Sequence, residues 1–162
     1  MKNKEMKNER EQTRVNLEEQ LSPHFTLREM IASGKAIRLG IENVPTPEAV
    51  VNLRALCQNV LEPLRRHMGC VRVTSGYRSD ILNGAVGGAK HSQHLRGEAA
   101  DLHCSSLDQA RRWYGFIRDN LEFDQLLLER RLGNGCCWLH VSYVRQPGHR
   151  QNRKDSRFVT AK

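Results

Sequence analysis

The stretch SQHLRGEAAD at residues 92–101, together with WLHVS at 138–142, decides which fold and which chemistry this chain can carry. His94 and Asp101 are seven positions apart, a spacing that would separate them by about 10 Å along a continuous helix. Donors to one metal ion must all lie roughly 2 Å from it, so these side chains can share an ion only if the chain bends between them. Gly97 provides the bend, because glycine tolerates backbone angles closed to other residues and lets two chain segments approach closely.

The residues that follow Gly97 alternate small or apolar side chains with polar ones. This period of two is typical of a half-buried strand and predicts one at 99–103. Asp101 and His103 should lie on the same face of that strand. From there Asp101 can turn back toward His94.

The third donor is expected from WLHVSY at 138–143, a second strand-like segment. Leu139 and Val141 are predicted to point into the core, so His140 should point to the opposite side. Two histidines and one carboxylate can bind a zinc ion and leave its fourth position open for a water whose pKa falls to about 7. A histidine on a strand is more often an ordinary surface residue, and it is the combination of both stretches that points to a metallopeptidase.

Three blocks of the chain resemble the M15 metallopeptidases, a group of zinc D-Ala-D-Ala carboxypeptidases and L,D-endopeptidases that includes phage endolysins and shares its fold with the hedgehog signalling domain. The order and spacing of the blocks are similar to the short, phage-like branch of this group. The resemblance implies zinc as the cofactor, with His94, Asp101 and His140 as its ligands. The blocks are SGYRSDILN at 75–83, SQHLRGEAAD at 92–101 and WLHVSY at 138–143.

The same resemblance implies that Arg78 faces a carboxylate or a carbonyl of the substrate. Peptide hydrolysis builds negative charge on the carbonyl oxygen, and peptidoglycan stems carry free carboxylates, so a fixed guanidinium could serve either task. Ser92 and Asn83 belong to the same blocks and are predicted to support substrate binding. Without the flanking blocks, each of these residues would read as a solvated or turn residue.

The chain departs from the family pattern at Cys137, where many M15 enzymes carry the acidic residue that activates the water and protonates the leaving amine. Glu129 is the expected replacement, because a hairpin through 130–135 would return the chain toward His140. Glu98 is the second choice. A strand-end carboxylate paired with a neighbouring arginine is the alternative reading of Glu129, and a thiolate ligand at Cys137 stays open.

Composition indicates one domain, since the chain has 162 residues and 38% hydrophobic content. We expect a charged N-terminal lead at 1–20, a zinc peptidase domain at 21–144 and a basic C-terminal tail at 145–162. No apolar run approaches the ~20 residues of a membrane span, and residues 1–20 lack the apolar core of a secretion signal. We therefore expect a cytoplasmic protein that reaches the cell wall only if released or exported by another route. Five cysteines without CxxC spacing suggest a reduced protein.

The tail holds six basic residues and one acidic residue, and much of the net charge of +8. A basic strip suits the anionic cell envelope. It could also contact nucleic acid, but interleaved aromatic residues and nucleic-acid motifs are missing, so nucleic acid is not the expected partner. We expect a monomer whose partner is a peptidoglycan peptide.

Apolar periodicity predicts an α+β fold, with helices packed on a small antiparallel sheet and the zinc on the open face of that sheet. Thr26 and Glu29 should form a capping box for a helix ending at Ala32. Pro47 should open a long helix that ends near Gly69 and is kinked by Pro63. The other expected elements are strands at 71–74, 124–129 and 138–143 and helices at 79–84 and 107–120.

Three functions follow from these patterns, of which the third and least expected is a nucleic-acid-associated phage protein that relies on its basic tail. The first is a zinc peptidase that cuts peptide bonds in peptidoglycan stems or cross-links, as carboxypeptidase or endopeptidase. The second is a zinc-containing module that holds wall peptides with little or no catalysis, which the loss of the acid at Cys137 would explain.

Overall fold

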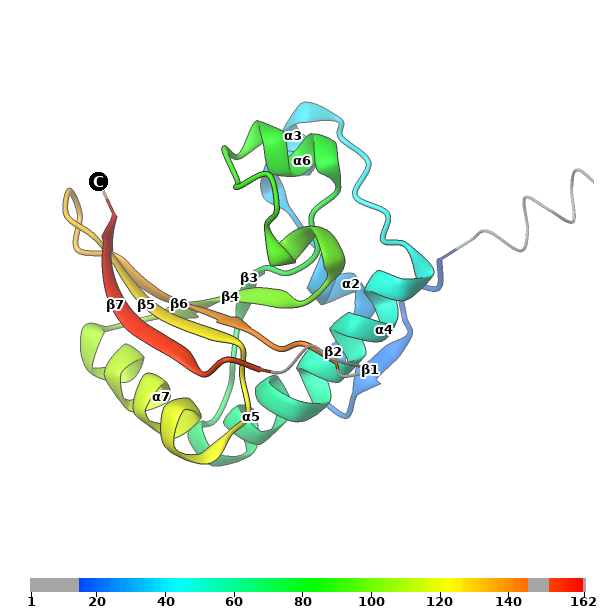
Figure 1. Ribbon diagram of the computed structural model, residues 1–162. Helices are drawn as coiled ribbons and strands as arrows, with labels where there is room; N and C mark the ends of the chain where they lie inside the picture. The colour runs from blue at the N-terminus through cyan, green and yellow to red at the C-terminus, as the bar shows by residue number, and fades with distance from the viewer. Residues whose placement is uncertain (1–14, 146–151, 162) are drawn as a thin grey trace, which may run out of the picture.

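A mixed five-stranded sheet organises the computed structural model, which describes residues 15–145 and 152–161. Helix α7 (Leu107–Asn120) packs on one face of the sheet, while α6 (Asp80–Ala85) lies on the other side (Figure 1). The predicted α+β class is confirmed. Across the sheet the strands are β3 (Val73–Ser75), β4 (Ala99–Cys104), β6 (Cys137–Ser142), β5 (Gln125–Arg131) and β7 (Asp155–Ala161).

Strand β7 was not expected. The sequence predicted a small antiparallel sheet and a basic tail at 145–162 outside the peptidase domain. The first four strands pair antiparallel, but β7 runs parallel to β5, from Gln125 opposite Asp155 to Arg131 opposite Ala161. Backbone hydrogen bonds along the β5 edge can hold this charged segment in place without an apolar side-chain pattern. The folded unit therefore continues past residue 144, the boundary expected from charge. Most of the predicted N-terminal lead, residues 1–14, lies outside the described residues.

The long helix predicted from Pro47 to near Gly69 forms in three consecutive pieces. They are α4 (Pro47–Leu56), a π-helical turn (Cys57–Leu61) and α5 (Glu62–Met68). In the wide turn the Glu62 N–H donates to the carbonyl of Cys57, five residues back. Pro63 follows at once and has no N–H to give, so the wide turn coincides with the place where α-helical pairing fails.

Smaller elements complete the fold. The capping box of Thr26 and Glu29 forms as predicted at the start of α2 (Leu27–Ile31). The remaining elements are β1 (Gln20–Ser22), β2 (Phe25–Thr26), α3 (Gly34–Leu39), which sequence periodicity did not predict, and the 3₁₀ helix η2 (Gln93–Arg96).

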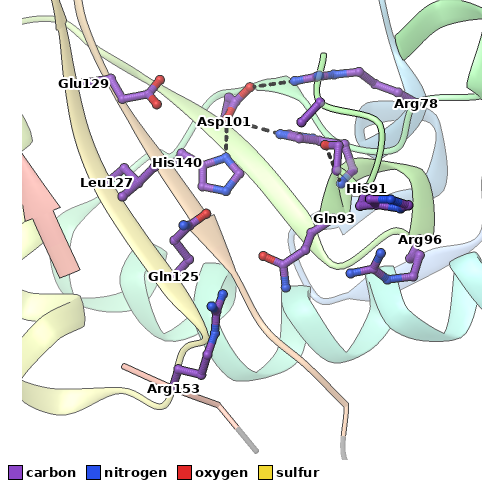
Figure 2. Close-up of a pocket in the computed structure, with 13 residues that line it drawn as sticks. Arg78, His91, Gln93, Arg96, Asp101, Gln125, Leu127, Glu129, His140 and Arg153 are labelled. Atoms are coloured by element: carbon purple, nitrogen blue, oxygen red, sulfur yellow. Dashed lines mark hydrogen bonds and ion pairs between the residues drawn. The ribbon is translucent and has the colours of Figure 1, made fainter. Parts of the chain in front are cut away.

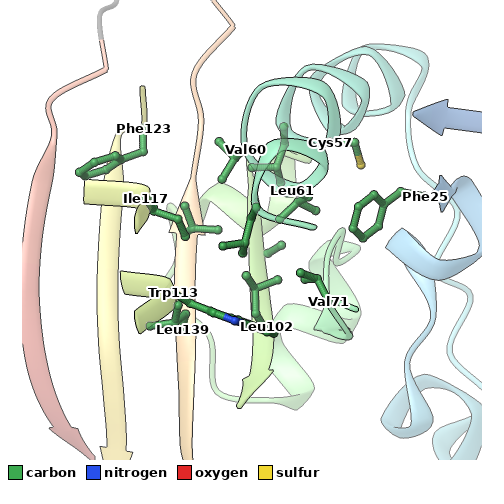
Figure 3. Close-up of a cluster of buried hydrophobic side chains, with 14 of the residues drawn as sticks. Phe25, Cys57, Val60, Leu61, Val71, Leu102, Trp113, Ile117, Phe123 and Leu139 are labelled. Atoms are coloured by element: carbon green, nitrogen blue, oxygen red, sulfur yellow. The ribbon is translucent and has the colours of Figure 1, made fainter. Parts of the chain in front are cut away.

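The hydrophobic core fills the space between the helices and one face of the sheet (Figure 3). Leu102 and Leu139 from the sheet meet Trp113 and Ile117 from α7, and all four are buried. Each such side chain contributes roughly 1.5–3 kcal/mol when removed from water. The opposite face of β4 and β6 does not pack against this core, so it can carry polar side chains.

Two further expectations concern membranes and cysteines. Among the described helices, none is both long and apolar enough to cross a bilayer. All five cysteines are free thiols.

Candidate metal centre

The pairing of β4 with β6 brings two of the predicted zinc ligands together. Asp101 lies directly opposite His140 in the antiparallel register, and their side chains share the face turned away from Leu102 and Leu139. His94 arrives from η2, which ends at Gly97 with φ +71°. This is the bend that the sequence predicted between His94 and Asp101.

Gly97 is also a point of close contact. A Cβ atom there would lie 2.4 Å from the carbonyl oxygen of Ala49 in α4. Only glycine allows both the left-handed backbone and this approach, so the turn is pressed against the long helix.

Three donor atoms converge on one point. The Asp101 Oδ1 lies 2.9 Å from the His140 Nδ1 and 3.4 Å from the His94 Nε2, and all three atoms fall within 4.8 Å of one another. Ligands at about 2.0–2.1 Å from a tetrahedral zinc ion stand about 3.4 Å apart. Two imidazoles and one carboxylate at this spacing fit a zinc ion, and Figure 2 shows the His140 ring beside the Asp101 carboxylate.

His94 is held by contacts that determine which ring nitrogen could bind a metal. Its side chain is buried, and its Nδ1 lies 2.6 Å from the carbonyl oxygen of Gly76. An Nδ1–H donated to that oxygen leaves Nε2 free of its proton and able to bind metal. Ser92 caps η2, where its Oγ accepts from the His94 N–H at 3.3 Å. Ser92, predicted to bind substrate, lines the cavity at the metal centre and also positions His94.

Asp101 is kept ionised by its neighbours. Burial acts to raise its pKa, but the contacts of its carboxylate with His140 and His94 outweigh burial and hold the pKa of Asp101 well below its usual value. Its second oxygen, Oδ2, accepts from the Arg78 Nη2 at 3.2 Å. The carboxylate is therefore ready to bind a cation at neutral pH.

Arg78 is fixed on three sides. Its Nε donates to the Ser75 Oγ at 3.0 Å and its Nη1 to the Asn83 Oδ1 at 3.2 Å, in addition to the Asp101 contact. The Asn83 amide nitrogen donates to the carbonyl of Ala89 at 2.9 Å. Asn83 is buried, contacts Arg78 and does not line the first cavity, whereas Arg78 does. A role of Asn83 in binding substrate stays a prediction.

Glu129 reaches the metal centre from β5. The residue lies opposite Trp138 in the β5–β6 pairing, and its carboxylate is turned toward Asp101 and His140 (Figure 2). Burial and the charge of Asp101 raise the pKa of Glu129, against the lowering effects of His140 and of a hydrogen bond from the Trp138 side chain. The sequence also allowed Glu129 to be a strand-end carboxylate paired with a neighbouring arginine. Among the described ion pairs, none joins Glu129 to Arg130 or Arg131.

The other candidates for the acid lie elsewhere. Glu98 is buried and pairs with Arg96 at 2.8 Å, and it is not among the residues that line the cavity. Cys137 is buried on the core side of β6, opposite to His140, so the described structure does not offer its thiol as a ligand. His91 lines the cavity outside the three-donor cluster, as expected for a surface histidine.

The three-donor cluster lies near the middle of a long cleft. One cavity of about 680 Å³ extends from it toward η2 and the start of β5, and a second of about 810 Å³ extends toward Trp138. Both cavities are lined by Arg78, Asp101 and Glu129. The cleft therefore continues on both sides of the metal centre.

Sequence reasoning missed four polar residues of the first cavity. They are Gln93, Arg96, Gln125 and Arg153. Gln93 and Arg96 lie inside the zinc block, and the alternation of β5 places Gln125 on the face of Leu127 and Glu129, so these carried a weak signal. Arg153 carried none, because nothing in the tail indicates that it returns to the site.

Comparison with known proteins agrees with this geometry. The family model described as peptidase M15 matches residues 23–131, which contain His94, Asp101 and Glu129. The zinc D-Ala-D-Ala carboxypeptidase of Streptomyces albus G is 43% identical over 63 residues, which make up 35% of this chain. The matched stretch spans only 25% of that relative's length. With a family match over more than half of its length, the chain belongs to the M15 peptidase family.

Proposed function

We propose that this protein is a zinc-dependent peptidase that hydrolyses peptide bonds in peptidoglycan stem peptides or cross-links. The observation that carries the proposal is the convergence of His94, Asp101 and His140 in a cleft that also holds a second carboxylate, Glu129. The family and the name of the bacterial relative support the choice of metal and substrate.

His94, Asp101 and His140 would hold the metal. When bound, zinc acidifies water and polarises a carbonyl group, which makes peptide hydrolysis feasible at neutral pH. The contact from His94 to Gly76 and that from Asp101 to Arg78 keep the donors oriented. Such support matters because loss of an outer contact typically weakens metal binding or activity by about 10- to 100-fold.

Glu129 is the proposed general base and acid. It would take a proton from the attacking water and deliver it to the nitrogen of the leaving amine, a task for which a positioned side chain contributes about 10²- to 10⁴-fold. Asp101, the other carboxylate among the described residues lining the first cavity, is engaged by both histidines. Glu129 thus takes the role that relatives give to the position of Cys137.

Arg78 supplies positive charge beside the reacting carbonyl. Its contacts with Ser75 and Asn83 fix the guanidinium before substrate arrives, so little ordering is needed when charge develops on the carbonyl oxygen. Its contact with Asp101 gives it a second task as a support of the metal ligand.

The cleft favours cleavage within a peptide over removal of a terminal residue. A carboxypeptidase needs a site closed beyond the last residue, whereas cavities on both sides of the metal centre leave room for chain in both directions. Mass analysis of the products from purified muropeptides tests this. Release of single D-alanine would support a carboxypeptidase, and cleaved cross-links or stems cut at an internal bond would support an endopeptidase.

The alternative, a wall-peptide-binding module, is motivated by Cys137. Digestion of purified peptidoglycan with and without a chelator separates the two functions. A peptidase loses activity with the chelator and regains it with zinc, while a His140→Ala variant stays inactive. Binding of peptidoglycan without turnover under all these conditions would favour the module.

A further inference from the structure

The C-terminal segment returns to the cleft and places Arg153 in its wall, beyond Gln125 (Figure 2). We propose that Arg153, together with Arg96, forms a subsite that binds a free carboxylate of the substrate away from the scissile bond. This inference rests on the proposed function for the identity of the substrate, a peptide with several free carboxylates.

Arg153 is anchored so that its charge faces the cleft. Its Nε and Nη2 donate to the two carboxylate oxygens of Asp124 at 2.9 and 3.0 Å, and its backbone N–H donates to the same group at 3.1 Å. The side chain of Asp124 is 2% exposed and that of Arg153 is 63% exposed. The anion of this pair is therefore buried beneath the cation, and solvent or a ligand meets the guanidinium.

Arg96 repeats the arrangement on the neighbouring wall. Its Nε and Nη2 donate to one oxygen of Glu98 at 3.0 and 2.8 Å. The side chain of Glu98 is 7% exposed and that of Arg96 is 39% exposed. Two arginines with buried counterions thus line the same cavity.

Gln93 joins the two pairs. Its amide nitrogen donates to Asp124 at 2.9 Å and lies 3.5 Å from Glu98. With the nitrogen directed to these carboxylates, the carbonyl oxygen of Gln93 is the end of the amide available to accept from a peptide N–H. Gln93 precedes the metal ligand His94, so the subsite is built on the backbone that carries the metal centre.

The charges along the cavity favour an anion at this end. Of the described lining residues, the carboxylates are Asp101 and Glu129, and both lie at the metal centre. The side chain of Arg78, at the metal centre, is 14% exposed, whereas those of Arg96 and Arg153 at the far end are 39% and 63% exposed. Their partners Glu98 and Asp124 do not line the cavity, so the guanidinium groups are what a ligand meets there. Guanidinium groups held in place lose little side-chain freedom when they bind a carboxylate.

The test compares two synthetic stem peptides with the same C-terminus, one with its internal carboxylate free and one with that group amidated. The wild-type protein should prefer the free acid. Arg153→Gln should lower kcat/KM for the acid by roughly 10- to 100-fold, mainly through KM, with little change for the amide. Arg157→Gln is the matched control, because Arg157 is 59% exposed, pairs with Asp155 and does not line the cavity.

Equal loss on both peptides, or no loss on either, would overturn the subsite and leave Arg153 as a brace for Asp124. Arg153→Gln leaves the buried carboxylate of Asp124 less well paired and could fail to fold for that reason. In that case the double variant Asp124→Asn, Arg153→Gln removes both charges and allows the same comparison of the two peptides.

Calorimetric binding of both peptides separates this inference from the proposed function. Preference for the acid that depends on Arg153, without cleavage of either peptide, would sustain the subsite and refute the peptidase. Cleavage without that preference would sustain the peptidase and refute the subsite. If the protein neither binds nor cleaves the peptides, both proposals are refuted.

Discussion

Replacing Glu129 by glutamine removes the proposed proton carrier and almost nothing else. The amide has the same shape and keeps an oxygen that can accept from the Trp138 side chain. General acid–base catalysis by one side chain contributes about 10²- to 10⁴-fold. No other carboxylate among the described residues of the first cavity is left without a metal-binding role, so we expect kcat to fall by roughly 10³- to 10⁴-fold, or about 4–5 kcal/mol in the barrier.

Three measurements on Glu129→Gln should show no loss while kcat falls. Zinc content and peptide affinity should match the wild-type protein, and the melting temperature should stay level or rise, because a neutral amide replaces a half-buried carboxylate. Glu122→Gln is the control, since Glu122 is exposed and pairs with Lys154 on the surface. Turnover of purified muropeptides at more than a tenth of the wild-type rate would refute Glu129 as the proton carrier.

The other predictions concern the metal, its supports and the stability of the fold. His140→Ala should lower the zinc content, measured by metal analysis, well below one ion per chain. His103→Ala is the control and should leave the zinc content unchanged, because His103 is exposed and lies outside the three-donor cluster. Equal zinc content in the two variants would remove His140 from the ligand set. Arg78→Ala should reduce kcat/KM by roughly 10²-fold and, because Arg78 braces Asp101, also weaken zinc affinity by about 10-fold or more in a competition titration. Gly97→Ala should lower the free energy of unfolding in urea by about 2–4 kcal/mol, because of the left-handed backbone and the contact with Ala49. Gly133→Ala is the control, since a Cβ there meets nothing within 4 Å. An equal loss in the two variants would contradict the packing argument. Glu62→Gln should destabilise the protein by about 1–3 kcal/mol at neutral pH. Burial acts to raise the pKa of Glu62, but hydrogen bonds from His24 and Ser22 outweigh burial and lower the folded-state pKa below 4.5. The stabilisation by the ionised carboxylate is therefore present above pH 4.5 and is lost as the pH falls through the folded-state pKa, so the difference in unfolding free energy between the two proteins should vanish in acid.

The convergence of the three proposed metal ligands could be predicted because their signals are local. Alternation fixed which face of each strand carries Asp101 and His140, and Gly97 marked the turn that returns His94 to them. The two strands then needed only to pair in register, which their apolar faces enforce against the core.

The missed features depend on contacts distant in sequence. The sequence of β7 shows no apolar alternation. Backbone pairing with β5 holds the strand, and its Phe158 is 67% exposed, so no apolar pattern was available to reveal it. Asn83 looked like a turn residue or a substrate contact, and only the fold reveals that it faces Arg78. Helix α3 is short and keeps Ile37 82% exposed, so its sequence has little of the periodicity that reveals amphipathic helices.

The carbonyl of Gly76 that orients His94 has a consequence for the order in which this protein matures. A Cβ on Gly76 would lie 2.2 Å from the carbonyl oxygen of Met30, and the Tyr77 N–H donates to that same oxygen at 2.8 Å. One proposed metal ligand is thus held in place by packing of its neighbours against α2. Many small zinc domains fold only when the ion binds. This chain has a hydrophobic core of its own, so we expect it to fold before it binds the proposed ion.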